Sequence, residues 1–537
     1  MYILQFYYVR KMSGEVKRRF FLKYQVLLFN QHNTYQAGSD FMLSGRLRNE
    51  KLKERIVNSN KASSWIKNGM TIGFSGFTGG DAKAIPAALA ERVKEEDKPF
   101  KIKVYTGAST SPAVDGVLAD AGIVELRIPY QSEKRMNRLV NSGTVKYVDQ
   151  HLSHTAEMIR SGALPPIDIA VIEATAITEE GHIIPSSSVG NSNIFAQYAR
   201  EIIVELNLAQ PIGLEGLHDI YDPGEQGSRK PLPIITAGQR IGTKAIVVNP
   251  DKIKGIVVTN RPEKSKALEP PDDETNKMAR FIIDFLRQEV QKGHLPPRLT
   301  PLQFGVGSVG NAVCHGFLQS EFKDLEVYSE VLQDSIFDLL DAGKVCVASG
   351  CSLTLSTERR AQVYAKLDSY KERVVLRPQE MSNNPGIIRR LGVISMNTAL
   401  EVDIYGNVNS THVAGSRMMN GIGGSGDFAR SARLTIFCTK SYAREGKVSS
   451  IVPMASHVDH TEHDVDVIVT EQGLADLRGL HPRGRAVEII EKCAHPSYRP
   501  KLQEYYQEAL SRGGHTPHVL EKALSWHIRL LQEGTMQ

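Results

Sequence analysis

The sequence FGVGSVGNAVCHGFLQSEFKDLEVYSEVLQDSIFDLLDAGKVCVASG, residues 304–350, decides the fold that we predict for this chain. It begins with a glycine turn that opens a helix, continues with a short strand over residues 325–329, and places Glu330 at the end of that strand. A second helix follows, with Asp334 or Ser335 as its N-cap and Gly343 at its end. In open α/β sheets, reactive groups gather beyond the carboxyl ends of the strands. Glu330 is therefore the first candidate for a reactive side chain.

The alternation of strands and helices extends over most of the chain, which predicts an α/β fold with mostly parallel strands. The proline-rich segment 261–271 is typical of a linker. We therefore expect an N-terminal extension over residues 1–44, one α/β domain over 45–260 and a second over 272–537. A charged helix is expected over 49–67, and a helix with an apolar stripe after residue 272. The strand-like runs cover residues 70–77, 102–109, 144–149, 167–177, 201–207, 245–249, 255–260, 326–330, 344–350, 374–379, 400–406, 432–438, 449–454 and 464–473.

Charge is concentrated at the N-terminus. The net charge is +5, and residues 1–44 hold six basic against two acidic residues, so the remainder carries about +1. No basic field marks the body as a nucleic-acid binder. The apolar runs of the first 44 residues fall short of the roughly 20 residues that a membrane span needs, so we expect no membrane partner. This segment is either an organelle transit peptide or an upstream extension, with a true start at Met12 or Met42.

The five cysteines show no CxxC spacing, and most lie inside apolar patterns. An odd count without paired spacing predicts buried thiols in a reducing compartment rather than a disulfide framework or a zinc site.

Gly305, Gly307 and Gly310 match the pattern GxGxxG, and Glu330 lies 20 residues beyond, where a ribose-binding acid of a dinucleotide site would lie. The preceding residues, PPRLTPLQF, are interrupted by prolines and do not predict a strand, which disfavours that interpretation. The turn could instead present N–H groups to a phosphate or an oxyanion. It could also be a tight turn without a ligand.

A second glycine cluster, NGIGGSGD, occupies residues 420–427. Glycine is costly in regular structure, so a close approach of backbone to a ligand is the better explanation. His457, His460 and His463 have a spacing that spreads ligands around a helix or across a strand, so we expect no metal site and regard them as hydrogen-bonding residues near a cleft. Glu471 ends a strand much as Glu330 does and could act with it, although a strand-end glutamate is usually only solvated.

Read together, several long motifs resemble the class I coenzyme A (CoA) transferases, in the acetyl-CoA hydrolase and acetate:succinate CoA-transferase subgroup. The resemblance covers the chain from about Gly45 to its C-terminus and implies two related open-sheet domains. Its carriers are GFSGFTGGDAKAIP, PLQFGVGSVGNAV, YSEVLQDS, SNNPGIIRRLGVISMN, DIYGNVNSTHVAGSRMMNGIGGSGDF, SHVDHTEHDVDVIVTEQGLADLRGL and KCAHPSY.

The resemblance implies that Glu330 is the nucleophile and that the backbone N–H groups of Val306 and Gly424 form an oxyanion hole. It also implies that Asn383 and Glu471 are polar active-site residues. Lys264 falls where some members carry an arginine that binds a CoA phosphate, which puts that contribution in doubt. The CoA contacts that the resemblance implies are Gly305, Val306, Gly307, Ser308, Val309, Asn420, Gly424 and Lys447.

The implied reaction transfers CoA between an acyl-CoA and a small free carboxylate through a glutamyl-CoA thioester, with acetate and succinate the expected pair. A glutamate with its reference pKa of about 4.3 would be ionised at neutral pH and would need no activating base. CoA is then a substrate, and no cofactor is expected. We further expect a homodimer in a mitochondrion or related organelle, or alternatively in the cytoplasm. The alternatives are an acetyl-CoA hydrolase, an NAD-dependent oxidoreductase and a non-catalytic CoA-binding or phosphate-binding protein.

Overall fold

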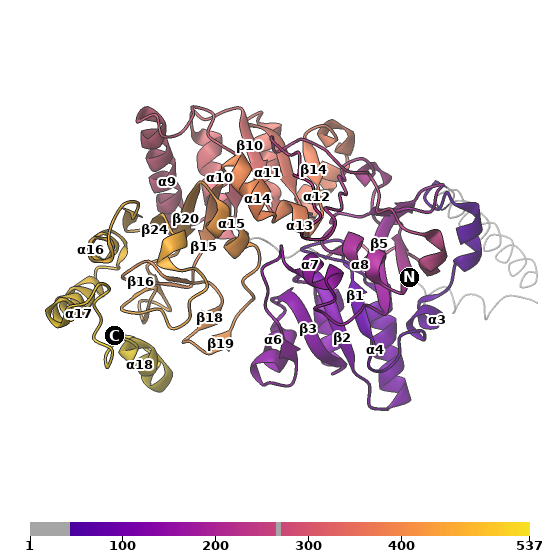
Figure 1. Ribbon diagram of the computed structural model, residues 1–537, viewed down its shortest axis with the longest axis horizontal. Helices are drawn as coiled ribbons and strands as arrows, with labels where there is room; N and C mark the ends of the chain where they lie inside the picture. Colours follow the sequence, from indigo (N-terminus) through magenta and orange to yellow (C-terminus); the bar gives the residue numbers. More distant parts are fainter. Residues whose placement is uncertain (1–42, 44, 265–269) are drawn as a thin grey trace, which may run out of the picture.

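The computed structural model describes residues 43, 45–264 and 270–537, so the predicted extension lies almost entirely outside the described residues. Two eight-stranded sheets organise the chain (Figure 1). In the first, the strand order is β4-β3-β2-β1-β5-β7-β8, with β6 paired to β5. Its strands are β1 (Thr71–Phe74), β2 (Ile102–Ser109), β3 (Val124–Gln131), β4 (Lys146–Tyr147), β5 (Ile169–Ile177), β6 (Ile183–Pro185), β7 (Glu201–Asn207) and β8 (Ile253–Thr259).

The second sheet has the order β14-β12-β10-β9-β15-β20-β24-β25. Its strands are β9 (Leu302–Phe304), β10 (Leu325–Tyr328), β12 (Val345–Gly350), β14 (Val374–Leu376), β15 (Ile394–Thr398), β20 (Leu434–Cys438), β24 (Val467–Thr470) and β25 (Gly473–Asp476).

The two sheets share one topology. In each sheet, the strand that comes first in the sequence, β1 or β9, lies in the centre. The next three strands in sequence order lie on one side of it, and three later parallel strands lie on the other side. All neighbours along both paths are parallel except β25, which pairs antiparallel with β24; β6 pairs antiparallel with β5. The predicted fold of two related open sheets with mostly parallel strands is confirmed. The carboxyl ends of the central strands are where such sheets place their sites.

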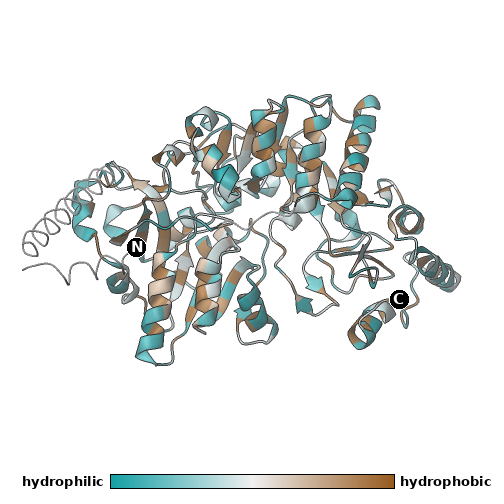
Figure 2. Cartoon of the chain, turned by 180° about the vertical axis from the view of Figure 1, so that it is seen from behind, coloured by the Kyte–Doolittle hydropathy of each residue, from teal (hydrophilic) through white to brown (hydrophobic). Residues whose placement is uncertain are grey.

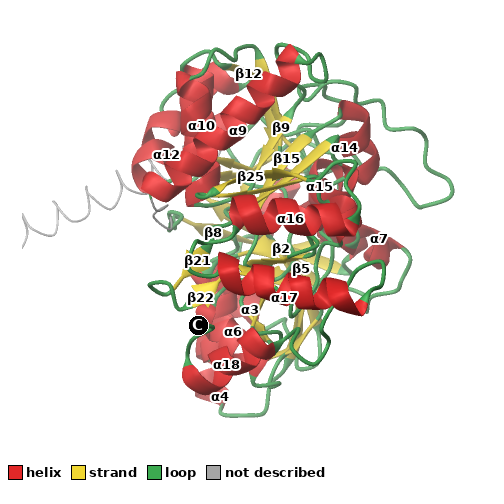
Figure 3. Cartoon of the chain, turned by 90° about the vertical axis from the view of Figure 1, so that its left-hand side faces the viewer, coloured by secondary structure: helices red, strands yellow, loops and turns green. Residues whose placement is uncertain are grey.

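Helices cover the sheets, and most carry a hydrophilic and a hydrophobic face (Figure 2). Helix α9 shows why the prediction after residue 272 is confirmed: Asp272 and Thr275 form a capping box, and Met278, Ile282 and Phe285 are buried on one stripe. The C-terminal helices α16 and α17 lie on the outside of the second half (Figure 3). The helices are α3 (Ser59–Ser63), α4 (Ala84–Glu96), α5 (Val117–Asp120), α6 (Lys134–Asn141), α7 (Thr155–Arg160), α8 (Ser192–Tyr198), α9 (Asp273–Gln291), α10 (Ser308–Gln319), α11 (Asp334–Asp341), α12 (Thr357–Tyr364), α13 (Gln379–Ser382), α14 (Pro385–Leu391), α15 (Ser425–Ser431), α16 (Pro482–Cys493), α17 (Arg499–Arg512) and α18 (Ser525–Glu533).

Four local predictions are wrong. Residues 302–304 do form a strand, β9, because pairing with β10 and β15 and burial on both faces outweigh the nearby prolines. Residues 245–249 form only an isolated bridge, between Ile246 and Ile183. The helix expected over 49–67 is a 3₁₀ helix (Glu50–Arg55) and the short α3. The N-cap position of α11 is Gln333, whose side chain makes no capping hydrogen bond; Asp334 is the first residue of the helix, and its carboxylate accepts a hydrogen bond from Ser356 N.

The two halves are joined by more than a linker. Residues 208–249 contain little regular structure, and part of this stretch runs along β14 of the second sheet. Asp219 N donates to Leu376 O, and the Asp219 carboxylate pairs with the fully buried Arg377. Residues 265–269 of the predicted linker are outside the described residues. No helix in the described part of the chain combines the length and the apolar character that crossing a membrane requires.

All five cysteines are free, and Cys314, Cys351, Cys438 and Cys493 are buried as predicted. Cys346 is the exception, because it lies exposed on β12.

Candidate active site

Glu330 lies between β10 and β11 (Val331–Gln333), at the carboxyl end of a near-central strand of the second sheet. Its backbone carbonyl accepts a hydrogen bond from Cys351 N at 2.7 Å, which fixes the turn. Its side chain is half-buried, and its Oε2 accepts a hydrogen bond from Asn383 Nδ2 at 3.0 Å. The structure thus brings together two of the predicted site residues, which are 53 positions apart in the sequence.

Asn383 is the residue that directly follows the single-turn helix α13, and it is completely buried. The next residue, Asn384, caps helix α14. The Oδ1 atom of Asn383 has no hydrogen-bond partner among the described residues, so its amide is oriented by the bond that Nδ2 donates to Glu330. An amide that donates to a carboxylate favours the charged form of that carboxylate.

Gly424, the N-cap of α15, touches the same carboxylate. A Cβ atom at this position would lie 1.5 Å from Glu330 Oε2 and 2.4 Å from Asn383 Nδ2. The backbone of Gly424 is in the right-handed helical region, so space rather than conformation requires glycine here. The backbone of the cluster 420–427 therefore approaches Glu330 closely, whereas the predicted approach to a ligand stays a prediction.

The glycine turn that follows β9, residues 305–310, lies next to the strand that leads into Glu330, because β9 and β10 are neighbours in the sheet. Gly307 has φ 132°, which favours glycine, and a Cβ on Gly310 would lie 2.2 Å from Gly305 O. Val306 is 44% exposed. Neither its N–H nor that of Gly424 donates a hydrogen bond within the described part of the chain. Helix α10 begins at Ser308 with no side-chain cap, so its first N–H groups are also open to an anion.

The carboxyl group of Glu330 does not keep its ordinary pKa. Burial raises the pKa to about 7; the hydrogen bond from Asn383 opposes this change, and the neighbouring Asp427 adds to it. The carboxyl group therefore titrates closer to neutral pH than its reference value would give, because the side chain loses water on folding.

The first half of the chain contributes site residues that the sequence gave no reason to select. The Tyr130 ring lies 3.5 Å from a Cβ built on Gly423, and burial raises the Tyr130 pKa to about 12, with the Glu330 charge contributing. Ser153 donates to Asp427 from its backbone N at 3.0 Å and from its hydroxyl at 2.6 Å. These partners are more than 270 positions apart, and no motif links them.

The Asp149 carboxylate accepts two hydrogen bonds from Ile422 N, at 2.8 and 3.1 Å. Burial raises the pKa values of both Asp149 and Asp427 to about 7. The first half of the chain thus holds the loop 420–427, and the same loop contacts Glu330 of the second half.

Glu471 is not joined to Glu330. It accepts hydrogen bonds from Ser441 N at 2.8 Å and from the Ser441 hydroxyl, and these bonds lower its pKa despite partial burial. It follows β24, which is the fourth strand from β10 in the sheet. At about 4.8 Å per strand, the axes of these two strands are roughly 19 Å apart. The role of Glu471 as a polar active-site residue, which the resemblance implies, stays a prediction.

The sequence also pointed to Asn420, Lys447 and Lys264 as positions for CoA contacts. Asn420 donates to Ser410 O and Gly421 O, at 3.2 and 3.0 Å. Lys447 is exposed in the hairpin between β21 (Tyr442–Ala443) and β22 (Val448–Ser449). Lys264 is also exposed.

His457, His460 and His463 lie in different environments. His460 is buried, its Nε2 lies 3.2 Å from Ser425 Oγ, and burial lowers its pKa to about 4. His457 pairs with Asp459, whereas His463 is exposed. Among the described residues, no group of three or more His, Cys, Asp or Glu side chains could hold a metal ion. His460 instead supports the first turn of α15, next to Gly424.

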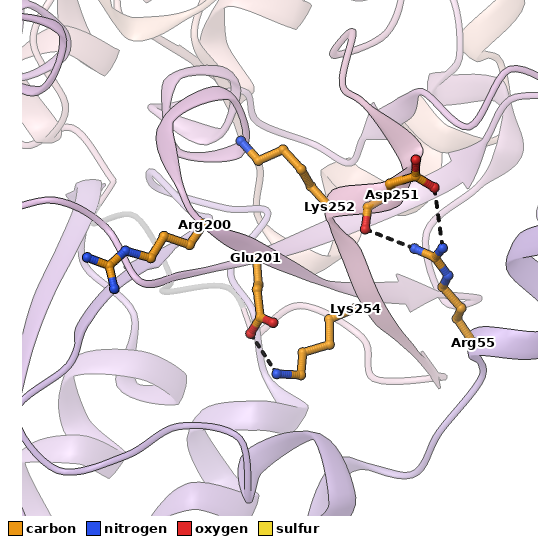
Figure 4. Close-up of a pocket in the computed structure, with 6 residues that line it drawn as sticks. All are labelled: Arg55, Arg200, Glu201, Asp251, Lys252 and Lys254. Atoms are coloured by element: carbon orange, nitrogen blue, oxygen red, sulfur yellow. Dashed lines mark hydrogen bonds and ion pairs between the residues drawn. The ribbon is translucent and has the colours of Figure 1, made fainter.

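A pocket of about 470 Å³ lies elsewhere, at the start of β7 and β8 (Figure 4). It is lined by four basic and two acidic side chains, and its cations already have partners. Lys254 pairs with Glu201, Arg55 with Asp251, Arg200 with Asp168, and Lys252 donates to backbone carbonyls. Because every cation is satisfied, we assign no ligand to it.

The chain matches known proteins over most of its length. The family model for the acetyl-CoA hydrolase/transferase N-terminal domain matches residues 42–258, and that for the C-terminal domain matches residues 360–506. The chain is 53% identical to a succinyl-CoA:acetate CoA-transferase of Clostridium kluyveri over 92% of each chain. It is 45% identical to a propanoyl-CoA:succinate CoA transferase of Escherichia coli, over 89% of this chain and 98% of that protein. An acetyl-CoA hydrolase of Schizosaccharomyces pombe is also 45% identical, over 92% of this chain and 99% of that protein.

Solved structures share the fold at lower identity. RipA from Yersinia pestis superposes with a TM-score of 0.67 at 23% identity, over 85% of this chain and 98% of that one. A 4-hydroxybutyrate CoA-transferase from Porphyromonas gingivalis gives 0.60 at 20% identity, over 86% and 99%.

Proposed function

The chain belongs to the acetyl-CoA hydrolase/transferase family, and we propose that it transfers CoA between an acyl-CoA and a free carboxylate, with Glu330 as the nucleophile. The observation that supports this role most directly is the contact of the Glu330 carboxylate with Asn383 Nδ2 and with the Cα of Gly424. By the names of the relatives, the expected pair is acetyl-CoA and succinate with acetate and succinyl-CoA, in either direction.

The reaction begins with ionised Glu330. A carboxylate oxygen attacks the thioester carbonyl, the C–S bond breaks, and an acyl–glutamyl anhydride and CoA thiolate result. The thiolate then attacks the glutamyl carbonyl, which releases the first carboxylate and leaves a Glu330–CoA thioester. An incoming carboxylate reverses these two steps and departs as the new acyl-CoA. No proton is consumed overall, so the enzyme needs a charged nucleophile and not a general base.

Each step passes through a tetrahedral oxyanion, which needs donors that are already in place. The N–H groups of Val306 and Gly424 suit this role. Neither has a hydrogen-bond acceptor among the described residues, and both lie on segments next to Glu330. The bond from Asn383 holds the carboxylate and keeps part of it ionised despite burial. In the dinucleotide interpretation, Glu330 would bind a ribose. The contacts of its carboxylate with Asn383 and Gly424 would then serve no step of the reaction.

Hydrolysis is the second candidate activity, because a relative of 45% identity is named an acetyl-CoA hydrolase. Water would then attack the Glu330 acyl or CoA intermediate in place of a carboxylate. We also propose a homodimer and a location in a mitochondrion or a related organelle, the cytoplasm being the alternative. Gel filtration with light scattering and imaging of the tagged full chain test these two points.

Trapping of the intermediate tests the nucleophile. We expect protein incubated with acetyl-CoA and then borohydride to lose activity irreversibly, because the Glu330–CoA thioester is reduced. Peptide mass spectrometry should find the reduced side chain at Glu330. An adduct on another residue, or full activity after this treatment, would contradict the proposal. Exchange of labelled acetate into acetyl-CoA, compared with release of free CoA, measures transfer against hydrolysis.

The pH dependence follows from the raised pKa of Glu330. We expect kcat/KM for acetyl-CoA to rise with unit slope up to about pH 7 and then to level off, because only the ionised carboxylate attacks. Asn383→Ala removes a bond that favours the charged form, so its inflection should lie at higher pH. The comparison separates Glu330 from the titrating phosphate of CoA, whose pKa the variant does not change. A wild-type profile that is flat down to pH 5 would contradict this assignment.

A further inference from the structure

A short segment of the first half, residues 149–160, contacts both structures that surround Glu330. Toward the glycine loop, Asp149 accepts from Ile422 N, and Ser153 donates to Asp427. Toward helix α13, the Leu152 carbonyl accepts from Gln379 Nε2 at 2.9 Å. The same segment ends in Arg160, which pairs with Glu380 of α13. The surroundings of Glu330 are therefore assembled across the two halves.

Arg160 and Glu380 form a buried bidentate pair. The two bonds, from Nη1 and Nη2, measure 2.6 and 2.5 Å, and the side chains are 1% and 5% exposed. Asp222 accepts a further bond from Nη2 at 2.8 Å, and the Arg160 Nε has no partner among the described residues. Burial makes a charge costly unless it is paired, so neither member of this pair can move without the other.

Glu380 belongs to α13, which is only one turn long and leads directly into Asn383. Asn383 N donates to Gln379 O, and Met381 O accepts the hydroxyl of Tyr328 from β10. A helix of one turn has almost no stability of its own, so its place depends on such outside contacts. A shift of Glu380 would therefore shift Asn383, whose Nδ2 lies 3.0 Å from Glu330 Oε2.

We propose that Arg160 is a positioning residue, which holds α13 through Glu380 so that the Asn383 amide meets the Glu330 carboxylate. This inference rests on the proposed role of Glu330 as nucleophile. Arg160 touches no reacting atom. Its effect reaches the reaction only through the position and orientation of Asn383.

The test uses Arg160→Lys, which keeps the charge but loses the bidentate geometry. Misplacement of a catalytic group by about 1 Å can cost roughly 100-fold in rate, so we expect kcat to fall by about 10- to 100-fold with KM little changed. The inflection of the pH profile should move upward, as in Asn383→Ala. The titratable groups that face Glu330 are Asp427, Tyr130 and Cys351, and none of them is altered by the substitution.

A double-mutant cycle gives the decisive result. In an Asn383→Ala background, Arg160→Lys should cause little additional loss of kcat, because the group that it positions is absent. Fully additive losses, or an unchanged pH inflection in Arg160→Lys, would overturn the proposal. If Arg160→Lys does not fold, Glu380→Gln gives the same cycle, since the amide keeps the shape and weakens the pair.

Arg485→Lys is the matched control. Arg485 is also buried, but its guanidinium donates to the carbonyls of Tyr405, Glu462 and Val465 within the second half. It should lower stability without moving the pH inflection. Borohydride trapping keeps the two hypotheses apart: an adduct away from Glu330 ends the proposed function, whereas additivity in the cycle ends only the role of Arg160.

Discussion

Glu330→Gln is expected to lower kcat for CoA transfer by about 10⁴-fold or more, the scale seen when a covalent nucleophile is removed. The glutamine amide has nearly the same shape and can still meet Asn383, but it cannot form the anhydride. The measurement is the initial rate of label exchange between acetate and acetyl-CoA, with acetyl-CoA binding followed separately. Acetyl-CoA binding should persist, because the substitution leaves the glycine turn 305–310 and the glycine cluster 420–427 unchanged. Activity within tenfold of wild type would end the assignment.

The same variant should be more stable at alkaline pH. The folded carboxyl has a pKa of about 7 against an ordinary value of 4.5, so the folded state binds the proton more tightly than the unfolded state does. The contribution of Glu330 to wild-type stability therefore falls as the pH rises from about 4.5 to about 7, and the neutral glutamine escapes this loss. We expect a gain of up to about 3 kcal/mol at pH 8 that shrinks toward zero near pH 4.5, measured by urea unfolding.

Glu326→Gln is the matched control for the activity measurement. Glu326 lies on the same strand, β10, and its carboxylate accepts a bond from Ala237 N at 3.1 Å. It should retain transfer activity. A variant of Glu330 that loses activity yet gains stability cannot owe its loss to unfolding.

Gly424→Ala is expected to lower kcat/KM by about 10²- to 10³-fold, similar to the loss of one oxyanion donor. The new methyl group would occupy the place of Glu330 Oε2, only 1.5 Å from its Cβ, so the carboxylate or the loop must move. The backbone angles of Gly424 are open to alanine, so conformational strain does not contribute. The measurement is steady-state kinetics with acetyl-CoA and succinate, together with the melting temperature.

Gly484→Ala controls for the substitution itself. Gly484 lies in α16, and a Cβ there would meet its first neighbour at an ordinary 3.5 Å, in His481. This variant should keep its activity. Wild-type kinetics in Gly424→Ala would show that the contact with Glu330 is not needed in the reaction.

The sequence alone determined the alternation of strands and helices, the glycine turn before α10, and the place of Glu330 at a strand end. These features depend on local pattern: apolar runs, glycines where φ is positive, and turn residues between them. Even so, β9 was missed, because its residues have weak strand propensity and pair only in the sheet. The long motifs that resemble the family also selected Asn383 and Gly424, without giving a reason for either.

Only the tertiary structure decided what Glu330 meets and how it titrates. Asn383, Gly424 and Asp427 come from segments 53 to 97 residues away, and Tyr130, Ser153 and Arg160 come from the first half of the chain. Burial raises the pKa of Glu330 to about 7, which no local pattern encodes, since loss of water depends on neighbours in space. For the same reason, Glu471 matched a site position in sequence but lies four strands away in the sheet.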